Sequence, residues 1–186
     1  PRRASARFDL AASHLKVGNA ESSLGRIEAA LESYRAGMEL FAALVARDPE
    51  NAEYQRAASV SANKVGSALT VLGRTAEAVK AFAAALETAR RLAAGDPKNV
   101  TAQRDVAVTS YKLMAAHRVL GDAVSWREAA EAAVAGFEKV HASSPDDPQA
   151  RRDLSVILGE AASGTLLLSP PGPEDIAAAL ARAKRA

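Results

Sequence analysis

The sequence predicts an all-α protein, a solenoid of αα-hairpin repeats with about eight helices. Its clearest sign is a fixed period of 48 residues, which places Pro49, Pro97 and Pro145 in similar phrases. Such a period is typical of repeat proteins, in which each unit packs on its neighbours. Composition agrees, because the chain is rich in alanine and only 4% aromatic, which favours closely packed helices over sheets. The apolar residues also recur at helical steps of three and four.

The period divides the chain into four repeats, at about residues 1–48, 49–96, 97–144 and 145–186. We expect them to form a single repeat domain over residues 1–186. Pro1 continues the proline series backwards, so the chain begins in register with the repeat. We therefore expect it to be a fragment of a longer protein.

The first repeat contains two predicted helices, at residues 1–24 and 27–47. Gly25 ends the first, since glycine tolerates the left-handed conformation beyond a helix end. The second has a continuous apolar stripe on one face. Asp48 and Pro49 end it, because proline disfavours helical geometry in the residue before it and cannot continue the helix itself.

The next repeats copy these signals at the same spacing. Gly73 and Gly121 repeat the turn glycine. Asn51, Asn99 and Asp147 are the predicted N-caps of the helices that open the second, third and fourth repeats, since Asn and Asp accept hydrogen bonds from the first helical turn. Proline directly after Asp147 fits this choice, because the first helical position accepts proline.

Two departures from the period are expected. In the third repeat, Glu128-Ala129 lies 51 residues after Glu77-Ala78. This predicts an enlarged turn at residues 122–126, with the helix resuming near Arg127. Trp126 would then be either a lid on the core or an exposed contact residue. In the fourth repeat, residues 169–173 form a proline-rich connector, and a last short helix follows from Glu174.

A small residue in the first helix is followed by Ala, an aromatic residue and a small residue in the second helix, and then by proline. The two copies are Gly18, Ala30, Tyr34, Gly37, Pro49 and Gly66, Ala78, Phe82, Ala85, Pro97. This pattern resembles the tetratricopeptide repeat (TPR) family, whose usual period is about 34 residues. The surplus of about seven residues per helix is close to two turns, so each buried face stays in phase. The resemblance implies a right-handed superhelix that acts as a non-catalytic protein–protein interaction scaffold.

The phrase around each proline, Asp-Pro-x-Asn followed by Gln-Arg-Asp, is also similar to repeat regions that follow the catalytic domain in some bacterial serine/threonine kinases of eukaryotic type. None of the kinase's own motifs is in this chain. This second resemblance implies a bacterial protein, and we expect it to be cytoplasmic. It leaves an alternative function open, a regulatory spacer module of a larger enzyme.

In the TPR family, ligands lie along the first helix of each repeat, on the concave face. Carried over by register, the candidate ligand-binding residues are Lys16, Asn19, Asn63, Lys64, Ser67, Tyr111, Lys112 and Arg118. The three lysines recur once per repeat and would form a ladder that attracts an acidic peptide or a C-terminal carboxylate. The alternative is that each lysine is solvated and shields apolar neighbours with its stem.

The period also repeats Arg104-Asp105 at Arg152-Asp153. These residues are either a second binding ladder or charge pairs near the helix start that help to set repeat stacking. His14, His117 and His141 form no metal-ligand motif, and no catalytic motif or phosphate loop is present. We expect no enzyme activity, metal or cofactor.

The remaining bulk properties restrict the partners. The net charge of +2 is too small to indicate nucleic acid, and no apolar run approaches the ~20 residues that cross a bilayer. We expect a protein or peptide partner, acidic if the lysine ladder binds it, and neither nucleic acid nor membrane. The alternative is a homodimer formed through exposed repeat ends.

Overall fold

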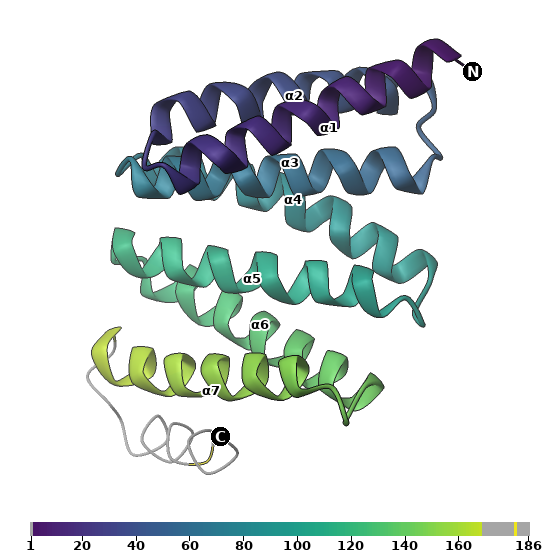
Figure 1. Cartoon of the computed structure of the whole chain (residues 1–186). Coiled ribbons are helices and arrows are strands. Elements are labelled where there is room, and N and C mark those ends of the chain that lie inside the picture. Colours follow the sequence, from purple (N-terminus) through teal and green to yellow (C-terminus); the bar gives the residue numbers. More distant parts are fainter. Residues whose placement is uncertain (1, 169–180, 182–186) are drawn as a thin grey trace. The chain divides into compact units, whose positions relative to one another are not determined.

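The computed structural model describes residues 2–168 and residue 181, and within them all regular secondary structure is helical. Seven helices follow one another, α1 (Arg2–Ser23), α2 (Ile27–Arg47), α3 (Ala52–Val71), α4 (Thr75–Gly95), α5 (Val100–Leu120), α6 (Ala123–Ser143) and α7 (Pro148–Leu168). Figure 1 shows them as consecutive antiparallel hairpins. The predicted connector at residues 169–173 and the helix expected from Glu174 lie outside the described residues.

The chain divides into two compact units, Pro1–Leu92 and Ala93–Ala186. The boundary falls close to the end of the second repeat, so each unit corresponds to two repeats. The first unit contains α1 to α3 and most of α4, and the second contains α5 to α7. The single domain over residues 1–186 and the right-handed superhelix stay predictions.

The predicted turns and caps are confirmed. Gly25, Gly73 and Gly121 have φ angles of 75°, 73° and 70°, in the left-handed region that glycine adopts without strain. The Asn51 side chain accepts from the Tyr54 backbone N–H at 3.2 Å, and Asn99 accepts from Ala102 at 3.0 Å. Asp147 accepts from the Gln149 backbone N–H at 2.9 Å, directly before α7 begins.

The enlarged turn predicted at residues 122–126 is wrong. Helix α6 begins at Ala123, not near Arg127, and Asp122 caps it by accepting from the Ser125 backbone N–H at 3.0 Å. The helices α2, α4 and α6 therefore start 48 residues apart without exception. The error came from matching Glu-Ala dipeptides in alanine-rich helices, where a slip of three residues is close to one turn and leaves the apolar face almost in place.

When the second and third repeats are aligned at the 48-residue spacing, one pair of contacting positions has its large and small side chains exchanged. A Cβ added to Gly66 would lie 2.5 Å from the ring of Phe82, so this aromatic side chain requires the glycine. In the third repeat, Met114 stands 48 residues after Gly66 and Ala130 stands 48 residues after Phe82. Met114 and Ala130 belong to one buried cluster. The large side chain has thus moved from the second helix of the hairpin to the first.

Trp126 lies in the first turns of α6 and is buried in the same cluster, together with Phe137 and Ile157. It stands where the earlier repeats have alanine. A Cβ added to Gly164 of α7 would lie 2.1 Å from the indole ring, so the two helices approach closely there. The interpretation as an exposed contact residue is therefore wrong, and Trp126 is part of the core of the second unit.

The core of the first unit joins α1, α2 and α3. Ala11, Phe41 and Leu44 are buried together, and Phe8 and Tyr54 pack against them. The rings of Phe8 and Phe41 meet edge to face, with centroids 5.2 Å apart, a favoured geometry for aromatic pairs. Residues from the second repeat therefore complete the core of the first.

Candidate functional site: the faces of α1, α3, α5 and α7

In the first unit, the predicted residues Asn19 and Lys64 lie together, on α1 and α3. The Lys64 amine donates to the Asn19 side-chain oxygen at 2.8 Å, and the Tyr34 hydroxyl donates to the same oxygen at 3.0 Å. The Lys64 amine also lies 5.5 Å from the centre of the Tyr34 ring, where a cation is attracted by the ring face. Asn19, Tyr34 and Lys64 thus form a polar cluster that ties the second repeat to the first.

Burial perturbs both titratable groups of this cluster. It lowers the pKa of Lys64, because the charged amine loses hydration. It raises the pKa of Tyr34, and the charge of Glu21 adds to this effect, while a hydrogen bond with Ser22 opposes it. Lys64 is therefore a half-buried side chain with contacts inside the chain. Lys64 is thus not simply solvated, as the alternative interpretation of the lysines predicted, because its amine bonds to Asn19 within the chain.

The other predicted residues of the first unit differ from Lys64. Lys16 is exposed on α1, whereas Asn63 and Ser67 are half-buried on α3. The Ser67 hydroxyl donates to the Asn63 backbone oxygen at 2.9 Å, one turn earlier in the same helix, a common local bond of helical serines. The period therefore predicts their place on the helix, while their surroundings depend on neighbouring helices.

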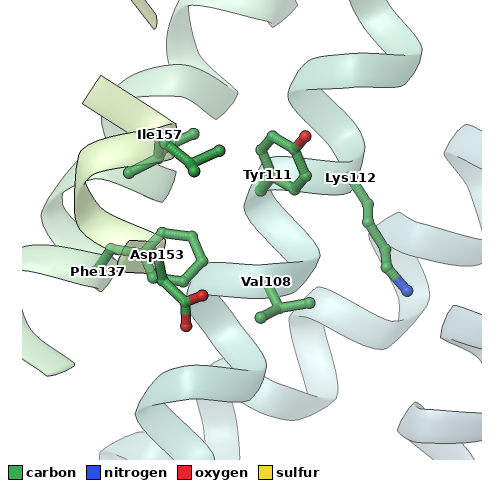
Figure 2. A pocket seen from close by; sticks show the side chains of 7 residues that line it. Val108, Tyr111, Lys112, Phe137, Asp153 and Ile157 are labelled. Carbon is green, nitrogen blue, oxygen red and sulfur yellow. The ribbon is translucent and has the colours of Figure 1, made fainter. Parts of the chain in front are cut away.

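In the second unit, a groove of about 290 Å³ lies between α5 and α7, with α6 beneath it. Its lining is mainly apolar, and consists of Val108, Tyr111, Lys112, Phe137, Asp153, Val156 and Ile157. Figure 2 shows Lys112 extending from α5 away from Phe137 and Asp153. The structure thus brings two predicted residues, Tyr111 and Lys112, to the edge of one groove.

Charged side chains connect α5 with α7 at both ends of this groove. At one end, Arg104 makes ion pairs with Asp153 at 2.7 Å and with Asp147 at 3.1 Å. At the other end, the Tyr111 hydroxyl donates to Glu160 at 3.0 Å, and Arg118 lies 3.9 Å from the same carboxylate. Arg104 therefore connects the third repeat with the fourth, an arrangement in line with the stacking interpretation of this charged position.

Burial raises the pKa of Tyr111 above its usual value, and the Glu160 carboxylate adds to this effect, since it stabilises the protonated phenol by accepting its hydrogen bond. Glu160, Val156 and Ile157 were not among the predicted site residues. The sequence contains a signal that could have predicted Val156 as a site residue. Val156 stands 48 residues after Val108 and so occupies the same helical position in the next repeat.

The described residues contain no group of three or more His, Asp or Glu side chains that could hold a metal ion. Of the helices from α1 to α7, none is long and apolar enough to cross a membrane.

No family model matches the sequence, and no curated protein matches it. Among solved structures, a crystal structure of MamA protein is 17% identical, with 95% of this chain and 93% of that chain covered and a TM-score of 0.29. A crystal structure of the de novo designed helical repeat protein DHR64 is 16% identical, with coverages of 99% and 79% and a TM-score of 0.31. The DHF79 filament is 18% identical, with coverages of 99% and 83% and a TM-score of 0.29. The helical-repeat architecture of this chain follows from its own hairpins and core.

Proposed function

We propose that this chain is a non-catalytic protein-interaction module that binds a peptide segment of a partner protein in the groove between α5 and α7. The observation that carries the proposal is the groove itself, which combines an apolar lining with charged side chains at its edges. Val156 supports it as well, since this large apolar side chain is more than half exposed while it lines the groove. Contact with a partner would remove it from water.

The size and charge of the groove restrict the ligand. A volume of about 290 Å³ lies just below the range for small-molecule sites, roughly 300–1,000 Å³. It suits one or two apolar side chains of a peptide. Asp153 forms an ion pair with Arg104, and Lys112 is the basic side chain among the seven lining residues. An acidic residue next to the apolar anchor would therefore be favoured.

A displayed peptide library, panned against the chain and followed by affinity measurement on selected peptides, tests the proposal. Val156→Glu should weaken binding at least about tenfold, because it places a charge against the apolar lining. Val124→Glu is the matched control, since Val124 is 72% exposed on α6, against 56% for Val156, and lies outside the groove. Failure to enrich any peptide, or equal losses in both variants, would contradict the proposal.

Lys112→Glu separates the acidic preference from groove binding as such. It should weaken peptides that carry an acidic residue and leave neutral peptides nearly unaffected, because only the former gain from the amine. Lys139→Glu, on the exposed surface of α6, is the control for the change in net charge. If the variants weaken acidic peptides equally, the groove binds them without help from Lys112.

A further inference from the structure

The outer face of α1 carries a stripe of apolar and small residues that ends at Leu24, one residue after the helix. Its members follow one another at alternating steps of four and three residues, and are Ala6, Leu10, Ser13, Val17, Ala20 and Leu24. The three large ones are well exposed, Leu10 at 51%, Val17 at 50% and Leu24 at 67%. A stripe of this kind on one helix face is a packing surface.

The same stripe is buried where it recurs in other repeats. Ser61 and Val65 of α3, which stand 48 residues after Ser13 and Val17, are buried. Ala58, which corresponds to Leu10, packs against the cluster that contains Phe41 and Leu44 of α2. In α7, the corresponding Ile157 and Ala161 are buried in the cluster shared with α6. This is the face by which the first helix of a repeat packs on the preceding hairpin.

The stripe on α1 is complementary to itself. Its large residues, Leu10, Val17 and Leu24, are seven apart, and so are its small residues, Ala6, Ser13 and Ala20. In two antiparallel copies, Leu10 would face Ala20, Val17 would face Ser13, and Leu24 would face Ala6. Every large side chain then meets a small one. A parallel pair would place large on large and small on small, which leaves gaps.

We propose that α1 packs antiparallel on α1 of a second copy of this chain, across a two-fold axis close to residue 15. Such an interface is isologous, because the same surface is used twice. The steps of four and three are those of an antiparallel coiled-coil seam. On one flank, Arg7 of one copy lies near Glu21 of the other, with opposite charge. On the other flank, the two Lys16 side chains come close to one another but stay in water, where their repulsion is screened.

Sedimentation equilibrium measures this association directly. Over loading concentrations from about 1 μM to about 500 μM, the mass should rise from monomer to dimer and stop there. Val17→Glu should raise the dissociation constant at least about tenfold, since Val17 lies next to the axis. Val71→Glu is the matched control, because Val71 is 69% exposed on α3 and lies off the stripe. Both sites are exposed, so neither variant should disturb the fold.

Cysteine cross-linking tests the register, since the chain contains no cysteine of its own. A mixture of Leu10→Cys with Ala20→Cys should form the mixed disulfide faster than either protein forms a disulfide with itself. The mixture of Ser13→Cys with Val17→Cys should behave in the same way. Faster self-disulfides in both mixtures would indicate parallel pairing and overturn the proposal.

Three results of the sedimentation experiment would also overturn it. A monomer at every concentration shows that the stripe does not bind a second copy. Growth beyond dimers indicates stacking of α1 on a different surface of the next copy, which does not close. Loss of dimer in Val71→Glu to the same extent as in Val17→Glu would place the interface elsewhere. Peptide binding in the groove of the second unit is measured separately, so failure of either proposal leaves the other standing.

Discussion

Replacing Gly66 by methionine and Phe82 by alanine in one protein gives the second repeat the arrangement of the third, which has Met114 and Ala130. Each change alone should be severe. Phe82→Ala empties a buried site and should cost about 3–5 kcal/mol. Gly66→Met inserts a side chain where even a Cβ would lie 2.5 Å from the Phe82 ring, and such overpacking costs about 1–3 kcal/mol or more.

If the two losses were independent, the double variant would lose about 4–8 kcal/mol. This is roughly half of the free energy of unfolding of a typical domain, which is about 5–15 kcal/mol. We expect a loss of at most about 2 kcal/mol, because methionine fills the space that the phenyl ring leaves. Urea unfolding, followed by far-UV circular dichroism, measures all three variants. Gly66→Met combined with Phe41→Ala is the control, since Phe41 belongs to a different cluster, and should show additive losses. A double variant as unstable as the sum of its parts would refute the exchange of volume.

Two further predictions concern the edges of the groove. Arg104→Ala should lower the free energy of unfolding by about 1 kcal/mol, since it breaks the partly exposed ion pair with Asp153, and the loss should shrink in about 1 M salt. Arg151→Ala, on the exposed surface of α7, should have little effect, and an equal effect would show that the ion pairs contribute nothing. Above pH 10.0, the ordinary pKa of tyrosine, stability should fall, because Tyr111 keeps its proton in the folded chain after the unfolded chain has lost it. Tyr111→Phe should reduce this slope in urea unfolding between about pH 9 and about pH 11, whereas an unchanged slope would exclude Tyr111 as its cause.

Local signals predicted the elements of the fold well where several of them coincided. Helix α2 has the predicted bounds, because an apolar stripe, a turn glycine before it and Asp-Pro after it all point to the same ends. In the third repeat, the start of α6 was predicted from the match of Glu-Ala dipeptides alone, and this prediction is wrong. Compared one position at a time, Gly66 and Met114 do not match, and neither do Phe82 and Ala130. The two repeats are equivalent only as contacting pairs, because each pair combines one large side chain with one small residue.

The candidate site was predicted in position more than in environment. The period places Lys16, Lys64 and Lys112 at equivalent points of three helices, yet one is exposed, one bonds to Asn19, and one lines a groove. These differences depend on tertiary neighbours, which a helical period does not encode. The wall of the groove on α7 was missed, because the candidate residues were taken from the first three repeats, although Val156 stands 48 residues after Val108.

The burial of Trp126 gives this molecule a spectroscopic reporter. It is the one tryptophan of the sequence, and it lies in the core of the second unit against Gly164. Its fluorescence therefore follows the melting of residues 93–186 alone, whereas the far-UV ellipticity of α1 to α7 follows both units. Two transitions recorded on the same sample reveal whether the halves unfold as one cooperative body, since coincidence of independent probes is the criterion of two-state behaviour.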